Sequence, residues 1–188
     1  MRSWLLLVMV LASGAFAQAE GKNVLALDTS WKTEAGQSAT LASLTKGQWY
    51  ALTFVYTSCA GTCPLTTKKL KRLDQALADA GKPLELMVVS LDPAHDSPAE
   101  LAKYRERYGL QDAKRWHLLV GDDAQVRTLT MLLEFKYTKN PESGVILHDN
   151  TVFLVAPDGE VKTTMSSLDQ PMEDFIAAVP APKKKPKR

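Results

Sequence analysis

The chain has 188 residues, of which 45% are hydrophobic and 23% are charged, and these proportions are typical of a soluble globular protein. Its net charge is +2, but without Arg2 and the basic residues that follow Ala181 the remainder carries about −4. The sequence has no basic face with interleaved aromatic residues, so it argues against nucleic-acid binding. The length predicts one domain with terminal extensions.

Residues 1–17 have the features of a cleavable secretory signal peptide. Arg2 supplies a positive charge, Trp4–Leu11 is an unbroken apolar run, and Ala15–Ala17 forms an A-x-A cleavage site. The apolar run is shorter than the roughly 20 residues that a membrane-spanning helix needs, and an uncleaved anchor is the alternative. We therefore expect a soluble, periplasmic mature chain that begins at Gln18, in a compartment where thiols can be oxidised.

Strand and helix patterns alternate along the rest of the chain. Residues 18–47 are weakly patterned and predict an irregular or hairpin lead-in. Further on, apolar runs rich in β-branched residues alternate with segments whose leucines have helical spacing, such as Leu70, Leu73 and Leu77. A Pro-Asp-Gly turn at 157–159 predicts a hairpin. The predicted strands are 49–56, 84–91, 116–121, 151–155 and 160–165, and the predicted helices are 65–80, 97–109, 122–133 and 171–179.

This order predicts an α/β protein with a thioredoxin-like fold. Strands that alternate with helices form a parallel sheet, and the final hairpin adds antiparallel strands to it. We expect a central mixed sheet flanked by helices, with an N-terminal extension and a C-terminal β-hairpin plus helix. The domain is predicted to span 18–180. Residues 181–188 form a basic tail, which we expect to be a disordered, solvated end or, alternatively, a contact with anionic lipid or an acidic partner.

Cys59 and Cys63 are the only cysteines of the chain, and they lie in the turn after the predicted strand 49–56. Ligands of open α/β sheets gather beyond the carboxyl ends of the strands, and a helix N-terminus beside the turn would lower a thiol pKa. A disulfide that closes such a short loop stabilises a protein by only about 2 kcal/mol, against about 4.7 kcal/mol for a 100-residue loop. A purely structural disulfide is therefore the least favoured reading, and a redox pair and a metal site remain open.

A metal site at these cysteines needs a third ligand, and the chain has three histidines. His117 lies within a predicted strand, where a packing role is expected. His95 follows the second core strand at the same end of the sheet and is a weaker candidate. His148 precedes the hairpin strand that runs beside the cysteine turn in a thioredoxin-like fold, so topology favours it. Thiolates select copper(I) and imidazole also permits copper(II), whereas structural zinc takes four ligands and the sequence offers no clear fourth.

Four ordered sequence blocks resemble the Sco/SenC family of thioredoxin-like, copper-binding assembly factors for cytochrome oxidase. The blocks are "FVYTSCAGTCP" (54–64), "VVSLDPAHDSPAELAKYRERYG" (88–109), "RWHLLVGDDAQVRTLTMLLEFKY" (115–137) and "LHDNTVFLVAPDGEV" (147–161). The resemblance covers about 41–179 and implies that Cys59, Cys63 and His148 bind copper, as Cu(I), Cu(II) or both.

Other residues of these blocks carry softer expectations. Asp92 and Asp96 match the second block, where we expect them to structure the loop or to support the ligands. Leu147 precedes His148 where the family usually has aspartate, and Asp149 follows it, so the partner that orients the imidazole is not predicted. Many relatives keep a membrane anchor, whereas we expect this chain to have a cleavable signal.

The resemblance implies an extracytoplasmic copper chaperone that delivers copper to a copper enzyme, most directly the dinuclear copper centre of cytochrome c oxidase. Its expected partners are an apo copper protein, such as an oxidase subunit, and a thiol reductant protein. Membrane contact is expected only through the basic tail or an uncleaved N-terminus. The alternative is a thiol–disulfide reductase with Cys59 and Cys63 as the redox-active pair. A thiol peroxidase is disfavoured because no proline precedes Cys59 within its block, and a non-catalytic interaction module is the weakest hypothesis.

Overall fold

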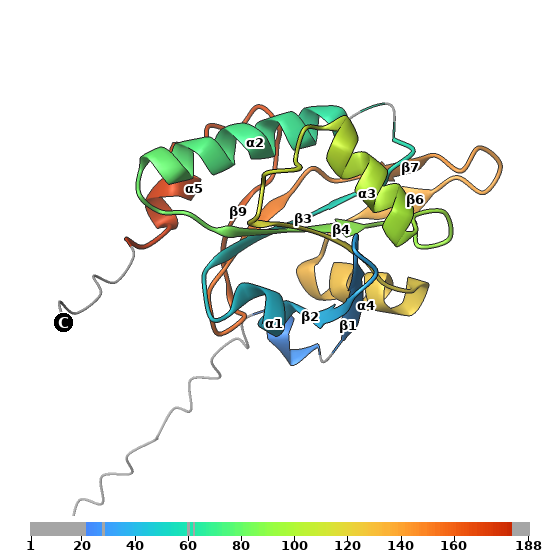
Figure 1. The fold of residues 1–188 in the computed structure, drawn as a ribbon, viewed down its shortest axis with the longest axis horizontal. Helices are drawn as coiled ribbons and strands as arrows, with labels where there is room; N and C mark the ends of the chain where they lie inside the picture. Colours follow the sequence, from blue (N-terminus) through green and yellow to red (C-terminus); the bar gives the residue numbers. More distant parts are fainter. Residues whose placement is uncertain (1–21, 28, 60, 62, 182–188) are drawn as a thin grey trace, which may run out of the picture.

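A computed structural model describes residues 22–27, 29–59, 61 and 63–181 (Figure 1). The predicted signal peptide 1–17 and the basic tail beyond Ala181 lie outside the described residues. None of the helices in the described part of the chain combines the length and the apolar character needed to cross a membrane.

The centre of the molecule is a seven-stranded mixed sheet with the strand order β2-β1-β5-β4-β3-β8-β9. The middle strands β3, β4 and β5 are parallel, and the outer pairs run antiparallel to their neighbours. A separate two-stranded ribbon is formed by β6 and β7. The strands are β1 (Ser30–Thr33), β2 (Ser38–Thr40), β3 (Tyr50–Val55), β4 (Glu85–Ser90), β5 (Trp116–Val120), β6 (Tyr137–Lys139), β7 (Ile146–His148), β8 (Val152–Val155) and β9 (Val161–Met165).

Helices cover both faces of this sheet, as Figure 1 shows. One face carries α2, α3 and α5, and the other carries α1 and α4. The connections β3-α2-β4 and β4-α3-β5 link parallel strands and lie on the same face, as expected for successive right-handed crossovers in one direction. The helices are α1 (Leu41–Thr45), α2 (Cys63–Asp79), α3 (Pro98–Arg107), α4 (Asp123–Leu133) and α5 (Glu173–Ala178), with a short 3-10 turn η1 (Val24–Ala26) at the start.

Burial explains why the central strands read as continuous apolar runs. Every residue of β3 and β8 is buried, and β4 is buried at all positions except Glu85. A strand covered on both faces by helices has no solvent side, so its sequence does not alternate between apolar and polar residues. The core therefore lies on both faces of β3 and β4, and it fixes the positions at which these strands end.

The predicted fold class is confirmed, including the hairpin lead-in (β1–β2), the C-terminal hairpin (β8–β9) and the final helix. Three details differ from the prediction. The lead-in also contains the short helix α1, where no helix was predicted. Helix α2 begins at Cys63, two residues earlier than the leucine pattern indicated, because the first turn is made by Cys63 and Pro64. The strands β6 and β7 were not predicted, because three-residue strands are too short to leave a pattern in the sequence.

Candidate metal centre

The cysteine turn connects β3 to α2 at the carboxyl end of the parallel strands. The Cys59 N–H donates to the Tyr56 carbonyl at 3.3 Å, and the Cys63 N–H donates to Cys59 Sγ at 3.4 Å. Cys59 is 8% exposed and Cys63 is fully buried, and both are free thiols. The turn therefore directs both sulfur atoms inward, with Cys59 nearer to solvent.

His148 reaches the turn from the other side, as the last residue of β7. Its Nδ1 lies 2.6 Å from the backbone carbonyl of Asp149. Because a carbonyl can only accept, Nδ1 is the donor in this contact, and Nε2 is the ring nitrogen that can offer a lone pair. That Nε2 lies 3.5 Å from Cys63 Sγ. The ring is thus held in the tautomer that a metal ligand requires.

A backbone group sets the orientation of the His148 imidazole. Asp149 orients the ring through its backbone carbonyl, so an acidic side chain before His148 is not needed for this contact. The Asp149 carboxylate instead accepts from the Lys136 N–H at 3.1 Å, and the Asp149 N–H donates to the Lys136 carbonyl at 3.0 Å. Leu147, which takes the preceding position, is 72% exposed.

The potential ligand atoms of Cys59, Cys63 and His148 all lie within 4.8 Å of one another. Among the residues that the structure describes, this is the one group of three Cys, His, Asp or Glu side chains placed to hold a metal ion. Ligands that bind at about 2.0–2.3 Å in a three-coordinate site lie roughly 4 Å apart, so a small contraction completes the geometry. Two thiols and one imidazole form a soft donor set that suits copper and lacks the fourth ligand of a closed zinc site.

The two thiols have different proton affinities. Burial raises the pKa of Cys59, but hydrogen bonds from the Cys63 thiol and N–H, from Tyr56 and from the Gly61 N–H together bring the Cys59 pKa below its ordinary value. Burial raises the pKa of Cys63 well above its ordinary value, and the neighbouring Cys59 raises it further. In the metal-free protein Cys59 is therefore the more acidic thiol of the pair, and Cys63 is the thiol that donates to it.

Two aromatic residues that the sequence analysis did not single out enclose the site. Burial, together with a hydrogen bond to Cys59, raises the pKa of Tyr56 to about 12. Its hydroxyl therefore stays protonated and donates to the sulfur. The His148 ring stacks on Phe135 and meets Tyr56 edge-on, each at a centroid distance of 6.0 Å. Tyr56 lies within the quoted block 54–64 and Phe135 within the block 115–137, but only the folded path of the chain brings them to His148.

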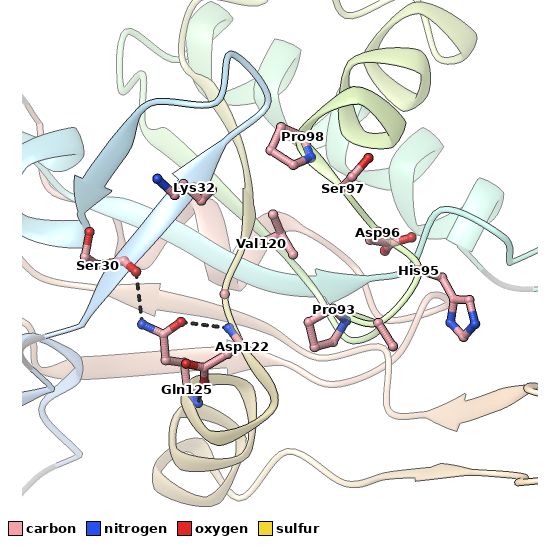
Figure 2. Close-up of a pocket in the computed structure, with 12 residues that line it drawn as sticks. Ser30, Lys32, Pro93, His95, Asp96, Ser97, Pro98, Val120, Asp122 and Gln125 are labelled. Atoms are coloured by element: carbon pink, nitrogen blue, oxygen red, sulfur yellow. Dashed lines mark hydrogen bonds between the residues drawn. The ribbon is translucent and has the colours of Figure 1, made fainter.

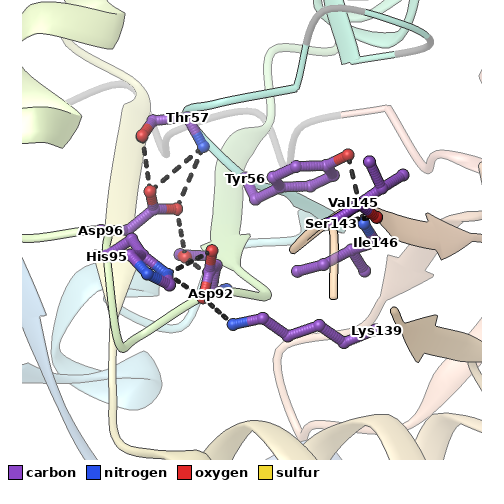
Figure 3. Close-up of polar contacts among 10 residues, drawn as sticks. Tyr56, Thr57, Asp92, His95, Asp96, Lys139, Ser143, Val145 and Ile146 are labelled. Atoms are coloured by element: carbon purple, nitrogen blue, oxygen red, sulfur yellow. Dashed lines mark hydrogen bonds and ion pairs between the residues drawn. The ribbon is translucent and has the colours of Figure 1, made fainter. Parts of the chain in front are cut away.

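Beneath the cysteine turn, Asp96 accepts a set of hydrogen bonds that ties the turn to the loop after β4 (Figure 3). The Thr57 N–H donates to both carboxylate oxygens at 3.1 and 3.2 Å, and the hydroxyls of Thr57 and Ser90 each donate at 2.5 Å. Arg107 donates to the Thr57 carbonyl at 3.1 Å. The predicted loop-structuring role of Asp96 agrees with these contacts, because the carboxylate bridges the ends of two neighbouring strands.

The other two histidines lie outside the three-residue group. His117 pairs with Glu85 at 2.7 Å on adjacent strands, in line with its predicted packing role. His95 contacts Asp92 at 2.9 Å. It borders a pocket of about 520 Å³ between β1, the loop after β4 and the start of α4, which Figure 2 shows. No cysteine lines that pocket, so it is separate from the candidate metal centre.

Comparisons with known proteins agree with the predicted family and fold. The SCO1/SenC family profile matches residues 22–181. The SCO1 protein homolog of Bacillus subtilis (strain 168) is 28% identical over 153 residues, which are 80% of this chain and 78% of that protein.

Solved structures share the fold of this chain. BsSco, described as a Sco family cytochrome c oxidase assembly protein with a disulfide switch, superposes with a TM-score of 0.69 at 25% identity over 80% of this chain and 88% of its own. Arabidopsis thaliana ScoI, solved with copper bound, has a TM-score of 0.68 at 19% identity over 80% of this chain and 92% of its own. Since the family profile covers most of its length, the chain belongs to the SCO1/SenC family.

Proposed function

We propose that this protein is a copper-binding chaperone that carries one copper ion on Cys59, Cys63 and His148. The observation that carries the proposal is the convergence of these three ligand atoms within 4.8 Å. Family membership supports it, since a relative of the same fold has been solved with copper bound. The donor set is chemically suited to Cu(I) and also accommodates Cu(II) through the imidazole.

Copper is the cargo of this protein, and the chain's own groups prepare the site to take it up. Cys59 has the lower pKa of the two thiols, and His148 Nε2 faces Cys63 Sγ. Because ligands must be deprotonated, binding displaces the proton of Cys63 and weakens as the pH falls. Oxidation of the two thiols to a disulfide removes both sulfur ligands. The metal would pass to a recipient by stepwise ligand exchange at the partly exposed Cys59 side of the site.

The proposed recipient is an apo copper protein outside the cytoplasm, most directly the dinuclear copper centre of cytochrome c oxidase. The description of BsSco as a cytochrome c oxidase assembly protein supports this assignment. The signal-peptide pattern of residues 1–17 supports an extracytoplasmic, periplasmic location. A thiol reductant protein would return the cysteine pair to its metal-binding form.

The test is a titration of reduced protein with Cu(I) in the presence of a competing chelator. We expect one equivalent to bind tightly to the wild type and this binding to be lost when both cysteines are changed to alanine. Equal affinity of the wild type and the Cys59→Ala, Cys63→Ala variant would refute the proposal. Circular dichroism of the variant confirms that it is folded.

A second candidate function, thiol–disulfide reduction, is favoured by the unequal thiols of the site. The Cys59 thiolate would attack a partner disulfide to form a mixed disulfide, and the Cys63 sulfur would then attack Cys59. This releases the partner as a dithiol, whose two thiol protons come from Cys63 and from solvent, and leaves Cys59 and Cys63 oxidised as a disulfide. A His148→Ala variant separates the two functions, because it should lose copper affinity but retain reductase activity, whereas either cysteine variant should lose both.

A further inference from the structure

The ribbon that carries His148 is not part of the main sheet. Strands β6 and β7 pair only with each other in the described part of the chain, through Tyr137–Lys139 and Ile146–His148. An isolated two-stranded ribbon is marginally stable in water. The position of the imidazole relative to the cysteines therefore depends on the contacts that hold this ribbon against the rest of the molecule.

One of these contacts is an ion pair at the far end of β6. Lys139 Nζ lies 2.7 Å from Asp92 Oδ1, and the two side chains approach from opposite sides in Figure 3. Lys139 is the last residue of β6 and is paired in register with Ile146 of β7. Ile146 in turn donates its N–H to the Tyr56 hydroxyl at 3.4 Å. The ribbon is thus held by Lys139 on one strand and by Ile146 on the other.

Asp92 is itself rigidly placed. Its side chain is only 4% exposed, its N–H donates to Ser90 Oγ at 3.0 Å, and its carbonyl accepts the Asp96 N–H at 2.8 Å. Asp96 holds Thr57 of the cysteine turn through the hydrogen bonds already described. A single loop after β4 therefore holds the cysteine turn through Asp96 and the ribbon through Asp92.

We infer that Asp92 and Lys139 are positioning residues, which set His148 against Cys59 and Cys63 by clamping the β6–β7 ribbon to the loop after β4. The inference deepens the proposed function and rests on it, because it concerns the third ligand of the same site. The nearly buried Asp92 carboxylate also lies 2.9 Å from His95 Nδ1. This second contact should hold Asp92 in place when Lys139 is changed. Removing the charge of Lys139 therefore releases the β6–β7 ribbon from the loop after β4.

The clamp predicts a specific pattern of copper affinities. Lys139→Met removes the charge and keeps the length of the side chain, and we expect it to weaken Cu(I) binding about tenfold, as is common for groups that support a metal ligand. Lys139→Arg preserves the ion pair and should restore the affinity. Lys136→Met removes the same charge from an exposed side chain just before β6, while leaving the backbone bonds of Lys136 to Asp149 in place, and should leave the affinity unchanged.

A double variant tests whether Lys139 acts through the imidazole. In a His148→Ala background, Lys139→Met should cause no further loss of Cu(I) affinity. A second readout uses metal-free, reduced protein: amide hydrogen exchange of the peptide spanning 137–149 should become faster in Lys139→Met and stay unchanged in Lys136→Met. Wild-type affinity and wild-type exchange in Lys139→Met would overturn the inference.

Other outcomes separate this inference from the proposed function. An equal loss of affinity from Lys139→Met in the wild-type and His148→Ala backgrounds would show that Lys139 does not act through His148, and would overturn the clamp alone. If His148→Ala binds Cu(I) as the wild type does, the imidazole is no ligand and the proposed three-residue site fails. The exchange measurement would still decide whether Lys139 holds the ribbon.

Discussion

At the scale of single residues, the two thiols of the site differ in exposure and in pKa. Cys59 is 8% exposed and has a lowered pKa, whereas Cys63 is fully buried and has a raised pKa. The difference arises because Cys63 and its backbone N–H both donate toward Cys59 Sγ, while burial leaves Cys63 protonated. The arrangement makes Cys59 the first sulfur to meet a copper ion, an oxidant or a partner disulfide.

This asymmetry predicts the order of alkylation. In metal-free, reduced protein, iodoacetamide should modify Cys59 before Cys63, because the thiolate is the reactive form. The rate should fall as the pH is lowered through the depressed pKa of Cys59 rather than near the ordinary thiol value. Cys63→Ala removes a donor to Cys59, so it should move the midpoint of this pH profile upward. Peptide mass spectrometry measures both effects, and first modification at Cys63 would contradict them.

The Asp96 carboxylate predicts a large effect on stability. Asp96→Ala leaves the Thr57 N–H and the hydroxyls of Thr57 and Ser90 without their buried acceptor, and we expect the free energy of unfolding to fall by about 2–4 kcal/mol. Asp112→Ala removes a carboxylate from an exposed position and should change stability by less than about 0.5 kcal/mol. Urea unfolding followed by tryptophan fluorescence compares the two, and similar losses would refute the role of Asp96.

The three residues that converge in the candidate metal centre could be predicted from the sequence, but those that position them could not. Cys59, Cys63 and His148 stand out because their side chains are rare in this chain and lie where the fold brings strand ends together. Tyr56, Phe135 and Lys139 have ordinary side chains, and nothing in their local sequence distinguishes them from core or surface residues. Their roles depend on contacts between segments far apart in the chain, which a pattern in one segment does not encode.

At the scale of elements, the turn between β8 and β9 is constrained both by its backbone conformation and by its packing against η1. Gly159 has φ +89°, and a Cβ atom there would lie 2.7 Å from Leu25 Cγ of the η1 turn. The Val24 N–H donates to the Gly159 carbonyl at 2.8 Å. The turn therefore needs glycine both for its left-handed backbone and for the close approach of η1.

Two glycine variants separate these requirements. Gly36 lies in the turn between β1 and β2 with φ +76°, and a Cβ atom there would meet nothing within 4 Å. Gly36→Ala should lower the free energy of unfolding by about 1–2 kcal/mol through backbone strain alone. Gly159→Ala should lower the free energy of unfolding by roughly a further 1–3 kcal/mol, because η1 must move. Chemical denaturation measures both, and equal losses would show that η1 does not constrain this turn.

Elements differed in how well the sequence predicted them. The helices α2 to α5 and the buried strands β3, β4, β5 and β8 are long enough to show periodicity or an apolar run, so their existence and order were predicted correctly. The five-residue helix α1 is too short for this and was not predicted. The β6–β7 ribbon was missed because three residues define no period. Its stability comes from tertiary contacts such as Lys139 with Asp92 rather than from its own sequence.

At the scale of the whole molecule, the site is assembled at one end of the sheet from three segments that are distant in sequence. The cysteine turn follows β3, the Asp92–Asp96 loop follows β4, and His148 ends β7. Because β3 and β4 are parallel neighbours in register, their following loops meet at the same edge. We propose that residues 18–180 form one folding unit, so that the site exists only when the sheet is complete.

This proposal predicts a single cooperative unfolding transition for a protein that starts at Gln18. Far-ultraviolet circular dichroism reports the sheet and helices, and tryptophan fluorescence reports the core through the buried Trp31 and Trp116. The two probes should give the same urea midpoint, as expected for a single domain. Separate midpoints would mean that the N-terminal strands around Trp31 unfold independently of the parallel sheet.

The most direct test of the account is the Cu(I) affinity of reduced wild-type protein compared with that of His148→Ala, measured against a competing chelator. The account predicts one tightly bound equivalent in the wild type and an affinity lowered about tenfold or more in the variant, with the fold unchanged by circular dichroism. Equal affinities would contradict it, because Cys59 and Cys63 alone would then account for copper binding.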